Sequence, residues 1–281
     1  MKLDGATFLL QWATGGLLFG WVTTRRREVS LGYGWLIRIT YGLMAVGSVA
    51  LFVANDHTAE AVVSALVVVA AAIALTSSVL RRGAGVRKRE ELRAGRRARV
   101  AAMLGRETEP VVDERGPEFE PFLDVFAPIF GIIGLLLAAR FAGVAYPLAA
   151  TRLLVGAAFL GSVTDAMLLG HWYLVQPGLQ REPVKELVRW TAIVWPLELL
   201  VFLWPVGMVQ VLDGVIDDGY DGLLGWIWVV CAVTTIGLVA MTWFALRERY
   251  YAAVMAATGL LYLAILTAFG TDLLARAVLK P

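Results

Sequence analysis

Eight long apolar stretches constrain this chain more than any other feature of its sequence. They cover residues 7–23, 31–54, 61–80, 122–141, 147–175, 186–212, 222–246 and 250–279. A bilayer core about 30 Å thick needs about 20 helical residues, each adding about 1.5 Å. Most of the stretches reach that length and are apolar all round, and in lipid a helix satisfies its own backbone hydrogen bonds. The sequence therefore predicts an all-α integral membrane protein with eight transmembrane helices.

The composition excludes an ordinary soluble protein and several kinds of cofactor site. Apolar residues make up 59% of the chain and charged residues 17%, against roughly 45–50% and 25% in soluble domains. A single cysteine, Cys231, rules out a disulfide framework and cysteine-based zinc or iron–sulfur sites. Of the two histidines, only His171 lies in a predicted span, so neither a metal site nor a bis-histidine haem is expected. Nucleotide-binding and hydrolase motifs are also missing, which leaves open whether the chain is an enzyme.

Basic residues concentrate on one set of the predicted loops and helix ends. Of the 25 Lys and Arg residues, 20 fall on this side and five on the other, namely Lys2, Arg140, Arg152, Arg276 and Lys280. The positive-inside rule makes the basic side cytoplasmic. Eight crossings then place both termini outside, and we expect the protein to reside in a bacterial plasma (inner) membrane.

The chain divides into three parts and carries a weak internal repeat. Residues 1–80 hold three predicted spans, 81–121 form a cytoplasmic loop, and 122–281 hold five spans. A shift of 151 residues lays 17–40 over 168–191 with six identities in 24 positions, including Trp21 on Trp172 and Arg38 on Arg189. The repeat predicts two four-helix halves, and because four is even, the halves would be parallel.

Two loops carry concentrated charge. The first part of the 81–121 loop holds ten basic residues between Arg81 and Arg106, in a helix-prone amphipathic run. It can lie on anionic lipid or dock a cytoplasmic partner subunit, and both readings stay open. The loop carries no aromatic residue before Phe119, so nucleic acid is not an expected partner. Residues 213–222, DGVIDDGYDG, either hold a hard cation or form a glycine-rich turn with solvated acids.

Two carboxyl groups lie deep within predicted spans. Asp165 is ten residues from the cytoplasmic end of the fifth span, and Glu198 is twelve residues from the cytoplasmic start of the sixth. A short loop joins these spans, so they are antiparallel neighbours and the two carboxyls can meet near the bilayer midplane. Such a pair is suited to holding or passing a proton. The alternative role is a structural hydrogen bond between helices.

A second set of candidate residues lies nearer the cytoplasmic end of the same spans. His171 would handle protons with Asp165 and Glu198, and a quinone headgroup would find aromatic walls and hydrogen-bonding groups close by. The candidate quinone-binding residues are His171, Trp172, Tyr173, Arg189 and Trp190. The competing interpretation is an interfacial aromatic belt with an arginine that extends toward the surface.

Three functions fit these observations. The first is a multi-pass membrane subunit of a respiratory-type electron-transfer complex, with a quinone- or proton-handling site in the cytoplasmic half of the bilayer. Its partners would be the lipid bilayer and other subunits docked on the 81–121 loop. The second is a stand-alone proton-coupled transporter, and the third is a non-catalytic membrane scaffold. The first is the hypothesis we adopt from the sequence.

Overall fold

The computed structural model describes residues 4–26, 29–81, 120–176, 181–205, 207–248 and 250–279. Regular structure in these residues is entirely helical, which confirms the all-α prediction for them. The helices are α1 (Gly5–Thr24), α2 (Leu31–Ala54), α3 (Thr58–Leu80), α5 (Leu123–Ala138), the 3₁₀ turn η1 (Ala139–Phe141), α6 (Tyr146–Val175), α7 (Glu182–Leu203), α8 (Met208–Leu212), α9 (Leu223–Ala245) and α10 (Tyr251–Val278).

Six of the described helices are long and apolar enough to cross a membrane. These are α2, α3, α5 together with η1, α6, α9 and α10. Helix α1 falls outside this set because it carries Gln11, threonines and glycines, and most of its residues are buried against other helices. Helix α7 falls outside because its first turns carry charged residues and Glu198 lies further along. A helix that is surrounded by other helices need not be apolar on every face. The low hydropathy of α1 is therefore explained by its central position in the bundle.

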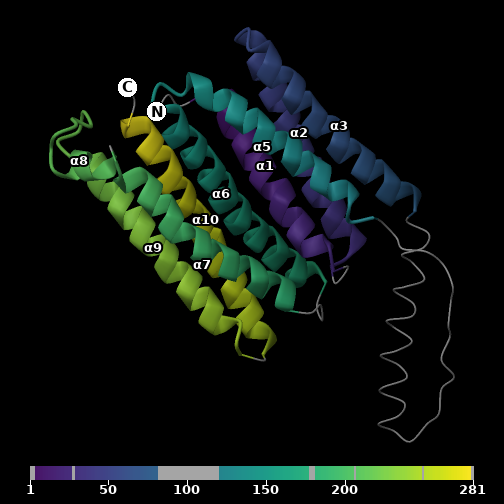
Figure 1. Ribbon diagram of the computed structural model, residues 1–281. Coiled ribbons are helices and arrows are strands. Elements are labelled where there is room, and N and C mark those ends of the chain that lie inside the picture. The colour runs from purple at the N-terminus through teal and green to yellow at the C-terminus, as the bar shows by residue number, and fades with distance from the viewer. Residues whose placement is uncertain are drawn as a thin grey trace, which may run out of the picture.

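The helices form two sets of four that meet along α1 and α6 (Figure 1). In one set α1, α2, α3 and α5 pack in a ring, and in the other α6, α7, α9 and α10 do the same. The start of α1 and the end of α10 lie at one end of the bundle, called here the terminal end (Figure 1). The end of α3 and the start of α5 lie at the opposite end, called the loop end, where Arg81 and Glu120 form a 2.6 Å ion pair.

Glycines let α1 and α6 approach each other very closely. A Cβ atom added to Gly15 would lie 1.8 Å from the carbonyl oxygen of Ala157, and one added to Gly161 would lie 2.2 Å from the carbonyl carbon of Gly15. Small residues at a crossing point are a common way for membrane helices to pack backbone against backbone. This contact joins the two sets of helices.

The predicted sixth span, residues 186–212, is not one continuous helix. The structure divides it into α7 and the short helix α8, with the break at Trp204 and Pro205. Proline has no amide hydrogen, so it cannot donate to the carbonyl of Val201 and cannot continue the helix ladder. The backbone then folds back so tightly that a Cβ atom on Gly207 would lie 1.9 Å from the carbonyl oxygen of Phe202.

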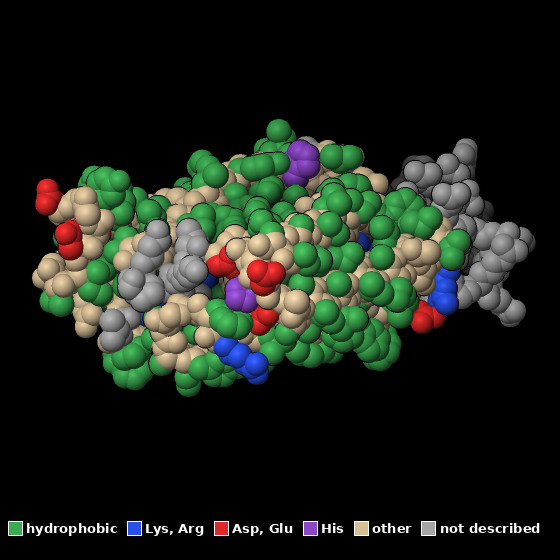
Figure 2. All heavy atoms as spheres, turned by 90° about the horizontal axis from the view of Figure 1, so that it is seen from above, with side chains coloured by type: hydrophobic (Ala, Val, Ile, Leu, Met, Phe, Trp, Pro, Cys, Tyr) green, Lys and Arg blue, Asp and Glu red, His purple; other side chains and the backbone are tan. Residues whose placement is uncertain are grey.

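The surface around the bundle is apolar. Figure 2, seen from above, shows hydrophobic side chains gathered over the flanks of the helices. Exposed large apolar residues occur along α2, α3, α9 and α10, including Leu43, Val62, Trp226 and Leu266 at 63–69% exposure. Apolar patches of this extent are rare on soluble monomers and are expected where lipid covers a protein. The six apolar helices and this surface indicate a membrane-embedded protein.

Candidate functional site

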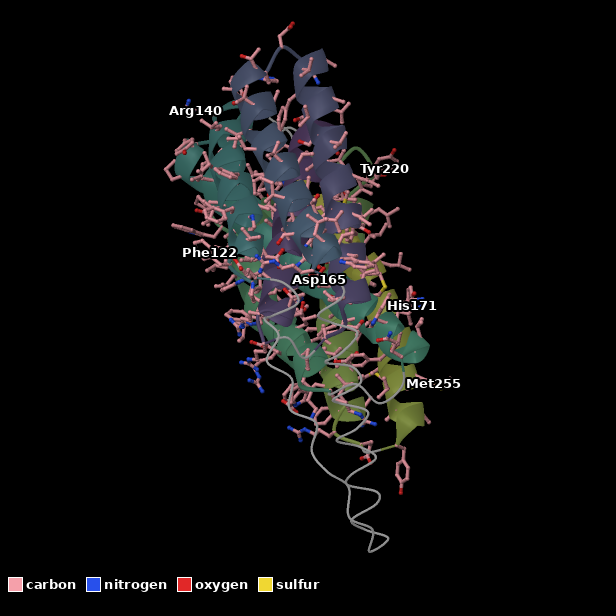
Figure 3. The ribbon with its side chains drawn as sticks, turned by 90° about the vertical axis from the view of Figure 1, so that its right-hand side faces the viewer. Phe122, Arg140, Asp165, His171, Tyr220 and Met255 are labelled. Atoms are coloured by element: carbon pink, nitrogen blue, oxygen red, sulfur yellow. The ribbon has the colours of Figure 1, made fainter. Side chains whose placement is uncertain are left out.

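Asp165 lies near the middle of the long axis of the bundle, inside it (Figure 3). Its side chain is fully buried, and Oδ1 accepts a 2.6 Å hydrogen bond from the Tyr41 hydroxyl of α2. No donor among the described residues reaches Oδ2. The Tyr41 ring sits against Gly16, where an added Cβ would lie 2.0 Å from a ring carbon. Gly16 therefore leaves the space that allows Tyr41 to reach Asp165.

The residue before Asp165 links α6 to α1. The indole nitrogen of Trp12 donates a 3.1 Å hydrogen bond to the Thr164 hydroxyl, which itself donates to the backbone carbonyl of Leu160. Asp165 and Thr164 thus connect α6 to α2 and α1 respectively. We call Asp165, Tyr41, Thr164 and Trp12 the Asp165 cluster.

Glu198 does not pair with Asp165, contrary to the expectation from the sequence. It belongs to a second buried group, called the Glu198 cluster, made of Gln11, Arg152, Glu198, Asp272 and Arg276. On α6, Gly156 lies against Gln11 and Asp272 of this cluster, and it precedes Asp165 by nine residues, which is about 13 Å of helix. The expected pairing required Glu198 to lie level with Asp165, but its partners lie at the level of Gly156, nearer the terminal end.

Asp272 and Arg276 form the centre of the Glu198 cluster. Nε of Arg276 donates to Oδ2 of Asp272 at 2.7 Å, and Nη2 donates to Oδ1 at 2.9 Å, within α10. The Gln11 amide also donates to Oδ1 of Asp272 at 3.5 Å. Asp272 is completely buried and Arg276 is 2% exposed. A bidentate arginine–carboxylate pair is among the stronger hydrogen-bonded contacts and orients both groups.

Arg152 is held by the break in α7. Its Nε donates a 2.7 Å hydrogen bond to the carbonyl of Val201, the group that Pro205 leaves without a helical donor. The guanidinium also lies 5.4 Å from the ring centroid of Phe202. Pro205 therefore leaves the Val201 carbonyl without a helical donor. This carbonyl is free to accept from Arg152, a buried cation beside Glu198.

Glu198 itself has an unusual environment. Its side chain is fully buried, and no donor among the described residues hydrogen-bonds either carboxyl oxygen. The charged groups around it are the carboxyl of Asp272 and the guanidinium groups of Arg276 and Arg152. Two carboxyl groups can share a hydrogen bond only when one of them carries a proton. A buried carboxyl without a hydrogen-bond donor is less costly as the neutral acid, and a neutral Glu198 can donate to Asp272.

This cluster encloses two of the basic residues that the sequence places on the outer side. Arg152 and Arg276 lie near the start of α6 and the end of α10, and they are 1% and 2% exposed. Asp272 and Gln11 were not singled out as candidates. The spacing of Asp272 and Arg276, four residues apart in the last span, is the signal that could have identified a pair.

The quinone-site candidates do not converge on Asp165. His171 is exposed on α6, and its Nδ1 shares a 3.0 Å hydrogen bond with the Tyr262 hydroxyl of α10. The Trp172 indole donates to the Ser30 hydroxyl at 2.7 Å, and Tyr173 is buried.

The two candidates on α7 also face outward. Arg189 is exposed, and its guanidinium lies 5.5 Å from the ring centroid of Trp243. Trp190 is 38% exposed and has its ring against Phe19. Of the five candidates, His171 is the one whose ring nitrogen lies at the exposed surface beside a second polar group.

Arg38 is a structural arginine in the described chain. It forms a bidentate pair with Asp124 of α5 at 2.7 and 2.6 Å, and it is 5% exposed. Arg189, which the 151-residue repeat aligns with Arg38, is exposed. The repeat therefore aligns helix with helix, but the two arginines that it aligns have different roles.

The acidic loop at the terminal end is organised by Asp218. Its carboxylate accepts hydrogen bonds from the backbone amides of Tyr220, Gly222, Leu224 and Gly225. Desolvation raises the pKa of Asp218, but these amides lower it by more, so the pKa lies below its ordinary value. Among the described residues, no three His, Cys, Asp or Glu side chains are placed to hold a metal ion. The loop geometry favours the turn interpretation over a cation site.

The predicted basic helix of the 81–121 loop lies outside the described residues, apart from the loop's ends. Comparison with known proteins finds no matching family model, curated protein or solved structure.

Proposed function

We propose that the chain is a proton-handling subunit of a bacterial plasma-membrane complex. The observation that carries the proposal is the presence of two buried carboxyl sites at different depths. Asp165 and Glu198 each have at least one carboxyl oxygen without a donor among the described residues. Ionisable groups inside a membrane are costly, and carboxyls in this setting commonly hold or relay protons. Two sites about 13 Å apart along α6, from Gly156 to Asp165, would cover nearly half of the hydrocarbon core of a bilayer.

The proposal includes eight membrane crossings with both termini outside. Helix α1 has 20 residues and α7 has 22, so each is about 30 Å long or slightly more and can span the hydrocarbon core. Arg25 and Arg26 both pair with Glu186 at the loop end, where the basic loops gather. This charge distribution supports a cytoplasmic loop end by the positive-inside rule. The two rings of four helices support the parallel-repeat interpretation.

The proposal is tested by proton flux into liposomes. The purified protein is reconstituted with a pH-sensitive dye inside, and a membrane potential is imposed. We expect Glu198→Gln and Asp165→Asn each to abolish most of the flux, because the amide cannot carry a titratable proton. Glu182→Gln is the matched control, since Glu182 lies on the same helix as Glu198, with a side chain 63% exposed and paired with Lys185. Wild-type flux in both core variants would contradict proton handling.

The same preparation separates the alternatives. Hydrophilic redox subunits that co-purify in mild detergent would support the respiratory-complex form of the proposal. Flux from the isolated chain, coupled to uptake of a solute, would support the stand-alone transporter. If the complex stays intact and transfers protons normally after both substitutions, the chain would act as a scaffold and would not handle protons itself.

A second candidate function, quinone binding, rests on His171 and Tyr262. Their shared hydrogen bond lies at an exposed position on the membrane-facing side of α6 and α10. In the neutral pair one group donates to the other, which leaves one N–H or O–H free to donate to a carbonyl oxygen of a headgroup arriving from the lipid. We expect His171→Ala and Tyr262→Phe to lower the quinone that co-purifies with the protein, measured by extraction and chromatography. Equal quinone content in wild type and both variants would remove this candidate.

A further inference from the structure

A small polar cavity opens at the terminal end, outside the clusters described above. Its volume is about 70 Å³, and it lies between α1, the α2–α3 turn, η1 and α6. The polar groups lining it include the side chains of Asp4, Thr7 and His57, while Leu153 lines it from α6. A single water needs about 10–15 Å³ by the same measure, so the cavity has room and polar partners for several.

The two helices that line this cavity carry the Glu198 cluster one turn deeper. On α1, Thr7 lines the cavity and Gln11 follows four residues later on the same face, about 6 Å further in. On α6, Leu153 lines the cavity and Gly156 follows three residues later, about 4.5 Å further in. A Cβ atom on Gly156 would lie 2.4 Å from Nε2 of Gln11 and 2.9 Å from Oδ1 of Asp272. Gln11 and Gly156, which lie against Asp272, are thus about one helical turn deeper than the residues that line the cavity.

Gln11 lies one helical turn deeper than the cavity-lining Thr7 and contacts Asp272. Its side chain is completely buried, and its amide nitrogen donates to Asp272. Its carbonyl oxygen has no donor among the described residues. A buried acceptor without a donor costs free energy unless water reaches it. The position of this oxygen, one turn below a polar cavity, fits water that extends from the cavity toward Asp272.

We propose that this cavity is the access path by which protons from the terminal side reach Glu198. In the exchange step a hydronium ion in the cavity gives its proton to the Glu198 carboxylate, which leaves water and a neutral acid that donates to Asp272. Arg152, Arg276 and Asp272 are the charged groups that face Glu198. The inference rests on the proposed function and adds the side of the membrane from which protons enter. The Glu198 cluster exchanges protons with the solvent at the terminal end, and the Asp165 cluster lies further toward the loop end.

Cysteine labelling tests the path. In a Cys231→Ser background, Thr7→Cys and His57→Cys are treated with a charged, membrane-impermeant thiol reagent added from the terminal side. The matched control is Phe8→Cys, because Phe8 neighbours Thr7 on α1 but packs against Phe269 of α10. We expect both cavity cysteines to be labelled and the control to resist labelling. Deuterium exchange of the Glu198 carboxyl, followed by infrared spectroscopy, should be lost after labelling of either cavity cysteine.

The outcomes separate this inference from the proposed function. If the Glu198 carboxylic-acid band is absent from the unlabelled protein, the proposed function fails. If the band is present but both cavity cysteines resist the reagent, or labelling leaves deuterium exchange unchanged, the access path is wrong and the proposed function stands. Labelling from the loop side alone would also overturn the path.

Discussion

Replacing Gly161 with leucine is expected to prevent α1 and α6 from packing together. Even a single Cβ atom at this position would lie 2.2 Å from the carbonyl carbon of Gly15 and 2.3 Å from its carbonyl oxygen. The obstructing atoms belong to the backbone, so the clash cannot be relieved by a change of rotamer. Overpacking usually costs 1–3 kcal/mol, and we expect about 3 kcal/mol or more here because two helices must separate.

The control is the same substitution on an open helix face. Gly237 of α9 has no atom within 4 Å of its added Cβ position, so Gly237→Leu should leave the fold intact. Size-exclusion chromatography and thermal unfolding in one detergent compare the two variants. Similar elution profiles and unfolding temperatures for both would show that the α1–α6 contact is not the joint between the two sets of helices.

The second large effect is expected at Asp272. Asp272→Asn removes the carboxylate that neutralises Arg276, and removing one partner of a buried ion pair costs about 3–5 kcal/mol. Glu198→Gln should behave differently. If Glu198 is already neutral, glutamine replaces it at similar size, and its amide can donate to Asp272 as the acid would. We therefore expect a change of no more than about 1 kcal/mol, the scale of one hydrogen bond.

The two variants are compared by thermal unfolding beside Glu182→Gln as the exposed control. The order of stability, with Glu198→Gln near wild type and Asp272→Asn far below it, is the informative result. An equal loss in both variants would mean that Glu198 is ionised and pairs with Arg152 and Arg276, and the proton-sharing interpretation would then be wrong.

The apolar pattern predicted the helices well because hydrophobic length is a local property of the sequence. Residues 31–54 coincide with α2, and 147–175 differs from α6 by one residue at its start. The sixth stretch is interrupted at Pro205. The sequence shows Pro205, but whether a proline kinks or ends a membrane helix depends on what can replace the lost hydrogen bond.

The candidate site was less predictable because it depends on contacts between distant helices. The sequence singles out Asp165 and Glu198, and both are fully buried. It does not single out their partners, since Tyr41 reaches Asp165 across 124 residues of sequence and Asp272 comes from the last helix. Charge counting places Arg152 and Arg276 on the outer side but does not show that they are buried, because one sequence does not show which face of a helix is enclosed by protein.

Infrared spectroscopy of the reconstituted protein tests the central claim, that Glu198 holds an exchangeable proton. A protonated carboxylic acid has a carbonyl stretching band that is separate from carboxylate bands and shifts in deuterium oxide. Our account predicts such a band in the wild type and the loss of one component in Glu198→Gln, with no loss in Glu182→Gln. Carboxylic-acid bands that are the same in wild type and Glu198→Gln would contradict it.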